Sequence, residues 1–364
     1  MAHKTQTHKM GIIGYGGMAG WHHDNISKRI EGLEIVAAHD IDAGRLKIAK
    51  DRGLKVYEKL GDFLKDGSFD IVLVATTNDA HKRMTVAALE AGKHVVCEKP
   101  VAMSVQDFDD MWTASKRTGK LFTVHQNRRW DKDFLTVKKA VETGLVGKPY
   151  TIESRVMGQN GVTHSWRAHK SMGGGMLFDW GVHLIDQIMC ITKEPVSEVY
   201  TNMHSVKTHE VDDYFKLVMR FVSGLSAQIE VSTYSLEKLP RWYVCGDGGG
   251  LVIDDWIMKG GECNGRITHS KTYEMTWTEE VIQTEGGPTR TMAPRPKETL
   301  EELPLPEIQT DWADYYKNIL AVLDGEEKEL LVKPEEARKV VQVMAAAFES
   351  HETGNSVKID RYYK

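Results

Sequence analysis

The sequence has few cysteines, and they are not arranged for a disulfide framework or a zinc site. Its four cysteines are Cys97, Cys190, Cys245 and Cys263, and no two of them form a C-x-x-C pair. Disulfide-rich secreted domains and cysteine-rich zinc sites both need closely spaced cysteines. We therefore expect reduced thiols and a cytoplasmic protein.

Long apolar runs and an excess of positive charge are also missing. No window approaches the roughly 18 uncharged apolar residues of a transmembrane helix, and the opening MAHKTQTHK has no apolar core like that of a signal peptide. Lys and Arg number 47 against 52 Asp and Glu, which gives a net charge of −5. Nucleic-acid binders are usually basic, so we expect neither nucleic acid nor a membrane as a partner.

The first third of the chain predicts a parallel sheet. Between Lys9 and about Asn127, short apolar runs alternate with amphipathic segments, and the runs are MGIIGYG, LEIVAAHD, DIVLVAT, HVVCEK and LFTVHQN. Strands that are nearly all apolar and are separated by helices indicate a doubly wound α/β sheet covered on both faces. The 364 residues suffice for about two domains, and we assign residues 1–127 to the first.

The period changes in the second predicted domain, residues 128–364. Residues 213–221 alternate between apolar and polar, and so do residues 225–232, which predicts a hairpin of half-buried antiparallel strands. Further strands are expected from Thr151 and from Val196. This domain is therefore predicted to be α/β with a large, mostly antiparallel open sheet.

The remainder of the second domain is less regular. The glycine-rich residues 246–250 predict a turn between strands. Residues 256–309 contain five prolines and few apolar runs, which predicts an irregular excursion serving as a lid or an oligomer contact. Two helices are expected to close the chain, and the second has Pro334 in its first turn and Gly354 past its end.

A dinucleotide-binding pattern follows the first predicted strand. Gly14, Gly16 and Ala19 form G-x-G-x-x-G/A, in which the first glycine permits a tight turn and the second lets the backbone approach a pyrophosphate. Asp40 ends the next strand roughly 24 residues after Gly16, near the spacing expected for the acid that binds the adenosine ribose. A carboxylate there repels a 2′-phosphate, so NAD is favoured over NADP, although Arg45 lies close by.

Two further segments carry chemistry. Lys99 follows the fifth predicted strand, where it can hold a substrate hydroxyl. Asp179 and His183 are four residues apart in GGGMLFDWGVHLIDQ and would share a helix face, on which the acid can orient the imidazole; Asp186 lies three residues further on. The alternatives are a buried structural histidine or a divalent metal site. No third ligand is evident, so no metal is expected.

Three segments together resemble the hallmark segments of the glucose-fructose oxidoreductase / inositol dehydrogenase / rhizopine catabolism (Gfo/Idh/MocA) family. They are GIIGYGGMA, TTNDAHKRMTVAALEAGKHVVCEKPVA and GGGMLFDWGVHLID. The similarity continues to the closing PEEARKVVQVMAAAFESHETGNSVKI. The resemblance implies an NAD-dependent oxidoreductase with a Rossmann domain and an α/β domain whose open sheet forms a homo-oligomer interface.

The resemblance also implies residue roles. The lysine of E-K-P and the acid and histidine of D-x-x-x-H are catalytic and contact the substrate, with the histidine as general base; they are Lys99, Asp179 and His183. The implied cofactor contacts are Gly14, Tyr15, Gly16, Gly17, Met18, Ala19, Asp40, Thr76, Asn78, His81, Glu98, Lys99, Gln126, Trp166 and Arg167. Thr77 stands where many members have proline.

The segment QNRRWDKDF resembles the sugar and cyclitol branch of the family, and the pair Trp166-Arg167 is similar to one found in members acting on pyranoses. Arg128 and Trp166 are therefore expected to contact the substrate, while Trp130 either stacks on a sugar ring or packs in the core. The expected reaction oxidises a secondary alcohol of a pyranose, for example C3 of a glucoside. The alternatives are an inositol 2-dehydrogenase, an NAD-dependent glycoside hydrolase without net redox change, and a regulatory protein without chemistry.

Overall fold

The first part of the chain forms a parallel sheet. The computed structural model describes residues 7–162, 165–256, 261–272 and 281–362. Its six-stranded sheet has the order β3-β2-β1-β4-β5-β6, and all its neighbours are parallel. The strands are β1 (His8–Ile13), β2 (Leu33–His39), β3 (Lys55–Tyr57), β4 (Ile71–Val74), β5 (His94–Cys97) and β6 (Phe122–Val124). The predicted doubly wound sheet is confirmed.

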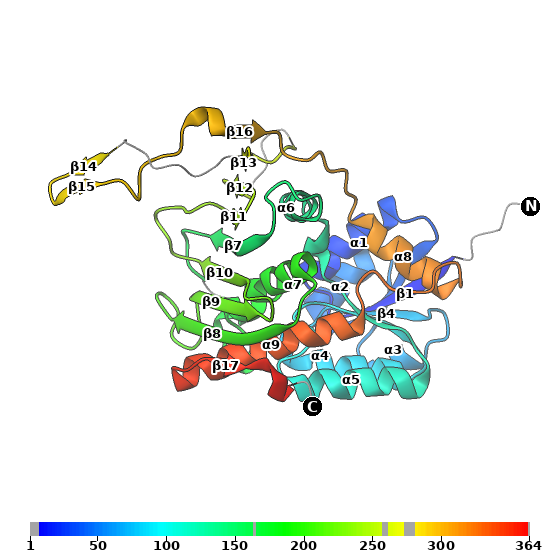
Figure 1. The fold of residues 1–364 in the computed structure, drawn as a ribbon. Helices are drawn as coiled ribbons and strands as arrows, with labels where there is room; N and C mark the ends of the chain where they lie inside the picture. The colour runs from blue at the N-terminus through cyan, green and yellow to red at the C-terminus, as the bar shows by residue number, and fades with distance from the viewer. Residues whose placement is uncertain (1–6, 163–164, 257–260, 273–280, 363–364) are drawn as a thin grey trace, which may run out of the picture.

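Helices cover this sheet on both faces. They are α1 (Gly17–Arg29), α2 (Ala43–Asp51), α3 (Leu60–Lys65), α4 (His81–Glu90) and α5 (Val105–Thr118). In Figure 1, α1 and α2 lie on one side of the sheet and α4 and α5 on the other. Every residue of β4 is buried, which explains why the strand is apolar throughout instead of alternating.

The second sheet has nine strands in the described chain, in the order β16-β13-β12-β11-β7-β10-β9-β8-β17. These strands are β7 (Pro149–Met157), β8 (Val196–His204), β9 (Tyr214–Phe221), β10 (Ser226–Ser232), β11 (Trp242–Gly246), β12 (Gly249–Ile253), β13 (Gly265–Ser270), β16 (Leu300–Leu303) and β17 (Val357–Lys358). β7 and β10 are parallel, and the other neighbours are antiparallel. The predicted open, mostly antiparallel sheet is therefore confirmed.

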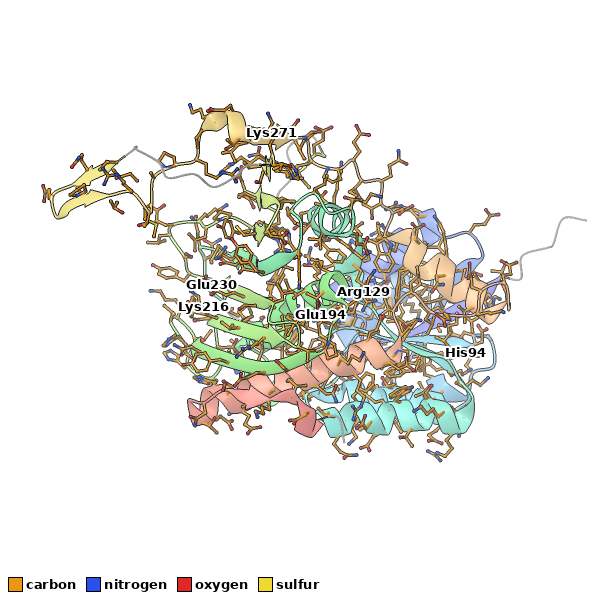
Figure 2. All side chains as sticks on the ribbon, viewed as in Figure 1. His94, Arg129, Glu194, Lys216, Glu230 and Lys271 are labelled. Carbon is orange, nitrogen blue, oxygen red and sulfur yellow. The ribbon has the colours of Figure 1, made fainter. Side chains whose placement is uncertain are left out.

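The two faces of this sheet differ as the alternating pattern predicts. Strands β9 and β10 form the expected hairpin, and Phe215 and Leu217 are fully buried on its inner face. The helices α6 (Lys132–Glu142) and α7 (Val182–Thr192) precede and follow β7 in the chain, and α7 packs on the inner face. Lys216 and Glu230, labelled in Figure 2, form an ion pair of 3.6 Å between β9 and β10. The outer face leaves Tyr200 exposed.

Residues 256–309 are more regular than predicted. Strands β13 and β16 extend the large sheet, while β14 (Ile282–Thr284) and β15 (Gly287–Thr289) form a separate pair that projects from the body (Figure 1). Strand β16 has the sequence LEEL and carries exposed glutamates, so no apolar run marks it as a strand. Residues 257–260 and 273–280 of the predicted excursion lie outside the described residues.

The two closing helices are α8 (Ala313–Leu323) and α9 (Pro334–Thr353). Helix α8 packs on the first domain, where Tyr316 meets His22 of α1, and α9 lies against β8 and α7 of the second domain as well as α5 and β6 of the first. Helix α9 has Pro334 in its first turn and ends at Gly354 with φ of 68°, as predicted. Just before α8, the ring of Trp312 lies 4.9 Å from that of Trp21 on α1. No helix in the described part of the chain is both long and apolar enough to cross a membrane.

His8, at the start of β1, binds a carboxylate at the end of α8 and a second one just before β4. Its Nδ1 lies 3.1 Å from Asp70 Oδ2, and its Nε2 lies 2.9 Å from Asp324 Oδ1. Burial alone would lower the pKa of His8, but the two carboxylates outweigh burial and raise it above the usual 6.5. A group with a raised folded-state pKa stabilises the fold fully below its unfolded pKa, and this contribution is lost as the pH rises through the folded-state pKa.

We therefore expect the stability advantage of the wild-type protein over His8→Phe to be larger at pH 6 than at pH 9. Urea unfolding of both proteins at several pH values measures this difference. A difference that stays constant with pH would show that folding does not raise the pKa of His8.

Candidate active site

A cavity of about 510 Å³ opens at the carboxyl ends of β1, β2, β4 and β5. Open α/β sheets bind their ligands at this edge. The second domain contributes the opposite wall. Most of the predicted site residues line the cavity, namely Gly14, Gly16, Gly17, Met18, Asp40, Thr76, Asn78, Glu98, Lys99, Trp166, Arg167 and Asp179. The predicted residues outside its lining are Tyr15, Ala19, His81, Gln126, Arg128 and His183.

The glycine loop between β1 and α1 has room for a phosphate group. Gly14 has φ of 88°, and a Cβ there would lie 2.8 Å from the carbonyl oxygen of Ala75, so another residue would strain the turn. A Cβ on Gly17, the first residue of α1, would meet nothing within 4 Å. Because amides at a helix N-terminus attract anions, the loop fits the pyrophosphate of a dinucleotide.

Asp40 both lines the cavity and fixes this loop. Its Oδ2 accepts from the amide of Tyr15 at 2.6 Å, and its Oδ1 accepts from the amide of Asp42 at 2.9 Å. The ring of Tyr15 is buried, with its hydroxyl 2.6 Å from His23 Nδ1, and Ala19 is buried in α1. Tyr15 and Ala19 therefore support the loop from behind, and their contact with the cofactor stays a prediction.

Two arginines, Arg45 and Arg83, also line the cavity. A guanidinium nitrogen of Arg45 lies 3.3 Å from where a Cβ of Gly16 would be. Arg83 belongs to no fixed motif, so nothing in the sequence assigns it. Other lining residues without a prior assignment are Ile13, His39, Ile41, Ala75, Ala80 and Met84.

Lys99 reaches from the end of β5 to the second domain. Its Nζ donates to Oδ1 of Asp179 at 2.9 Å and to the Asp179 carbonyl oxygen at 3.0 Å. Nε of Arg167 donates to Oδ2 of Asp179 at 3.0 Å. Burial alone would raise the pKa of Asp179, but the two cations outweigh burial and lower it. Asp179 is therefore an anion that holds two cations on the cavity wall.

His183 is buried close to this ion pair. It lies on α7, immediately after the π-helical turn Leu177–Gly181 that carries Asp179. Burial, followed by the charges of Lys99 and Arg128, holds the pKa of His183 well below 6.5. Its Nδ1 is buried and has no hydrogen-bond partner in the described chain. The imidazole is therefore neutral at neutral pH, the form that can accept a proton.

The expected pairing of Asp179 with His183 is not formed among the described residues. Both carboxylate oxygens of Asp179 face Lys99 and Arg167 instead. Two cations therefore hold this carboxylate in place of the neutral imidazole. Asp186 is also engaged elsewhere, because Arg129, labelled in Figure 2, binds both of its oxygens at 2.6 and 2.7 Å.

The T-x-N-x-x-H segment holds loops around the cavity. Nδ2 of Asn78 donates to the Gly173 carbonyl at 2.7 Å, which joins the two domains. The ring nitrogens of His81 lie 2.8 Å from the carbonyl oxygen of Pro100 and 3.1 Å from that of Thr76. His81 is fully buried and fixes these loops, and its contact with the cofactor stays a prediction.

Gln126 and Arg128 also lie outside the cavity lining. Gln126 is buried, with its Oε1 unpartnered in the described chain. The guanidinium of Arg128 lies 4.5 Å above the Trp180 ring and donates to Asp131 at 3.0 Å. The structure therefore places Arg128 beside the site, where its charge affects His183, and not on the cavity wall.

The tryptophans divide between packing and the site. Trp130 packs edge-on against Tyr315 at 5.7 Å, which supports the packing alternative for this residue. Trp166 lines the cavity, with the guanidinium of Arg167 lying 4.6 Å from its ring centre.

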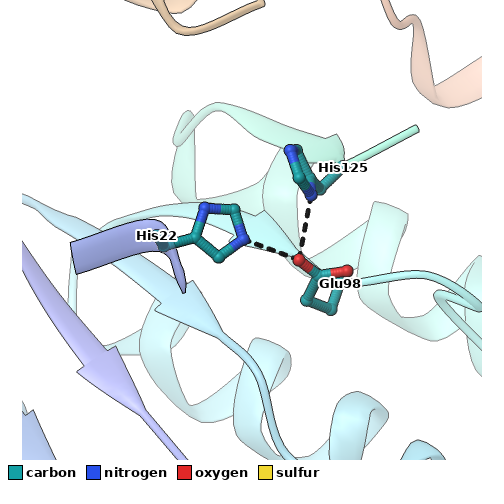
Figure 3. Close-up of side chains that lie close together, drawn as sticks. All are labelled: His22, Glu98 and His125. Carbon is teal, nitrogen blue, oxygen red and sulfur yellow. Dashed lines mark hydrogen bonds and ion pairs between the residues drawn. The ribbon is translucent and has the colours of Figure 1, made fainter. Parts of the chain in front are cut away.

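Glu98 belongs to a buried cluster that no sequence motif reveals. Its Oε1 accepts from Nε2 of His22 at 2.7 Å and from Nδ1 of His125 at 2.9 Å (Figure 3). Its Oε2 accepts from the amide of Lys99 at 3.2 Å. His22 is on α1 and His125 follows β6, so no spacing between them could have marked the cluster.

Comparison with known proteins extends over nearly the whole chain. Residues 8–126 match the model of an oxidoreductase family with an NAD-binding Rossmann fold, and residues 134–252 match a GFO/IDH/MocA C-terminal domain. The solved structure of an NAD-binding protein from Listeria innocua is 40% identical, with a TM-score of 0.90 over 97% of this chain and 99% of that one.

Curated relatives include two cyclitol dehydrogenases. The scyllo-inositol 2-dehydrogenase (NADP(+)) of Bacillus subtilis is 26% identical over 98% of this chain and 97% of its own length. The myo-inositol 2-dehydrogenase of Thermotoga maritima is 29% identical over 68% of this chain and 75% of its own length. With both family models and a relative of 40% identity in agreement, the chain belongs to the Gfo/Idh/MocA family of NAD-dependent oxidoreductases.

Proposed function

We propose that this protein uses NAD to oxidise a secondary alcohol on the ring of a pyranose sugar or a cyclitol. The observation that carries the proposal is the 2.9 Å ion pair of Lys99 and Asp179 on the wall of the cofactor cavity, close to the neutral His183. When bound, NAD supplies the acceptor for the hydride that leaves the carbinol carbon. The protein's own residues handle the hydroxyl and its proton.

Each polar residue of the site has one task in this reaction. Lys99 holds the reacting hydroxyl oxygen and stabilises the negative charge that develops on it. His183 accepts the hydroxyl proton, because its imidazole is neutral. Asp179 sets the direction of the Lys99 side chain through two hydrogen bonds. His183 and Lys99 therefore act on the same oxygen: His183 removes its proton, and Lys99 stabilises the negative charge that is left.

Two kinds of ring remain candidates for the substrate. The relatives from Bacillus subtilis and Thermotoga maritima are named as inositol 2-dehydrogenases, which favours a cyclitol. The pair Trp166 and Arg167 on the cavity wall favours a pyranose, and C3 of a glucoside is the position we propose within that class. Trp180 and Trp256, with rings 5.4 Å apart, offer further apolar surface beside His183 for the face of a ring.

We expect NAD and one class of ring alcohol to produce NADH in stoichiometric amount. The measurement is NADH absorbance after purified protein receives NAD with each of a panel of inositols, free pyranoses and glucosides. An aglycone released from a glucoside without net NADH would instead identify a glycoside hydrolase that recycles its cofactor. Neither NADH nor a released aglycone with any ring alcohol would contradict the proposed substrate class.

We expect Lys99→Met and His183→Ala each to lower kcat by at least about 10²-fold, since both act on the proton and charge of the reacting hydroxyl. Lys82→Met is the matched control, because Lys82 pairs with Asp107 and Asp110 away from the cavity. Steady-state kinetics and NAD affinity are measured for all three variants. A kcat near the wild-type value in either site variant would show that the substituted residue does not have its assigned role.

We expect Asp40→Asn to lower kcat/KM for NAD on the order of tenfold, because a charged acceptor for the ribose hydroxyls is lost. The same change removes repulsion of a 2′-phosphate, so the ratio of NADP to NAD activity should rise. Asp51→Asn, at the exposed end of α2, serves as the control. An unchanged ratio of NADP to NAD activity would mean that Arg45 and Arg83, and not Asp40, determine which cofactor is preferred.

A further inference from the structure

The cluster of His22, Glu98 and His125 is buried but borders the cofactor cavity. The three residues are 0%, 5% and 1% exposed. They come from α1, from the end of β5 and from the end of β6, and Figure 3 shows both rings directed at one oxygen of Glu98. Glu98 is the member that also lines the cavity.

Geometry indicates that both rings donate to Glu98. Nδ1 of His22 lies 2.9 Å from the hydroxyl of Tyr316, which can donate to it while Nε2–H donates to Glu98. Burial keeps the pKa of Tyr316 well above its usual value and lowers the pKa of His22. Nε2 of His125 is buried without a hydrogen-bond partner in the described chain, so the contact between Nδ1 and Glu98 is the one hydrogen bond that fixes this ring there.

Glu98 nevertheless carries a charge. Burial alone would raise the pKa of its carboxyl, but His125 and His22 outweigh burial and hold that pKa well below the usual range. No lysine or arginine in the described chain forms an ion pair with Glu98, because Nζ of Lys99 is directed at Asp179. Glu98 is thus a buried anion that hydrogen bonds from two imidazoles and one backbone amide hold in place, without a lysine or arginine in the described chain.

Aromatic rings shield this anion from water on the side away from the cavity. Trp21 stands edge-on to His22 at 5.3 Å, and Tyr315 stands edge-on to His125 at 5.1 Å. A charge in such surroundings is screened less than one at the surface, so it acts more strongly on a charge in the cavity. The titratable groups that face Glu98 are His22, His81, Cys97, Lys99, His125, His183, Tyr315 and Tyr316.

We propose that His22 and His125 are positioning residues that hold Glu98 as a permanent anion at the cofactor cavity, where it raises the affinity for oxidised NAD above that for NADH. The oxidised nicotinamide ring carries a positive charge and the reduced ring does not, so a nearby carboxylate favours the oxidised form. This proposal rests on the cofactor part of the proposed function and is independent of the substrate.

The test compares the dissociation constants of NAD and NADH, each measured by calorimetry without substrate. Glu98→Gln keeps an Oε1 that accepts from both imidazoles and removes the charge. We expect the ratio of the NADH constant to the NAD constant to fall about tenfold in this variant. Tyr315→Phe is the control, since it removes a buried hydroxyl and keeps the aromatic ring beside His125, and its ratio should match wild type.

His22→Phe and His125→Phe test the positioning role through pH. Without an imidazole donor, burial of Glu98 is no longer offset and its pKa rises, so the NAD preference should persist at pH 9 and weaken toward pH 6. The wild-type ratio should stay flat over this range. Thermal melts identify any variant that fails to fold, and Glu98→Gln then decides alone.

Three results would overturn the proposal. Equal losses of NAD and NADH affinity in Glu98→Gln would make Glu98 a contact without electrostatic selectivity. A flat ratio in both folded histidine variants would remove the positioning role. A divalent metal ion found in stoichiometric amount in the purified protein would mean that the imidazoles coordinate the ion instead of donating to Glu98. In each case the turnover assay with ring alcohols still tests the proposed function separately.

Discussion

The end of β5 places opposite charges on consecutive residues, and the site depends on how the backbone separates them. Successive side chains of an extended chain point to opposite sides. Glu98 therefore enters the first domain, where it meets His22 and His125, while Lys99 crosses to Asp179 in the second domain. If both side chains faced the same side they would neutralise each other, and the cavity would lose both a buried anion and a directed cation.

This separation requires contributions from distant parts of the chain. The imidazoles that bind Glu98 come from α1 and from the end of β6, and α8 supplies part of the aromatic layer that covers them. Lys99 needs Asp179, which lies on the turn before α7. Asn78 joins the segment that leads into this turn to the first domain by its hydrogen bond to the Gly173 carbonyl. Packing of α8 on the first domain is therefore a condition for the site, although this helix lies far from the cofactor loop in sequence.

The sequence predicts best what the backbone itself requires. Gly14 and Asp40 were predictable because a tight turn and a ribose contact fix both residue types and their spacing, and the buried strands were predictable because they are apolar throughout. The partners of Asp179 were not, since Lys99 and Arg167 reach it from other segments of the chain. His22 and His125 were not predictable either, because only the tertiary fold brings them together. Strand β16 was missed because its glutamates are exposed.

The arrangement around Asp179 explains how Lys99 can serve two partners in the proposed reaction. Asp179 binds Lys99 through one oxygen and Arg167 through the other. When Nζ of Lys99 turns one of its hydrogens toward a substrate oxygen, Arg167 still holds Asp179 ionised, so the lowered pKa of this carboxyl does not depend on Lys99 alone. An ionised carboxylate with a low pKa is a poor proton acceptor. The neutral imidazole of His183 is then left to take the proton. The pairing of Asp179 with Lys99 and Arg167 therefore explains why one residue stabilises the charge and another removes the proton.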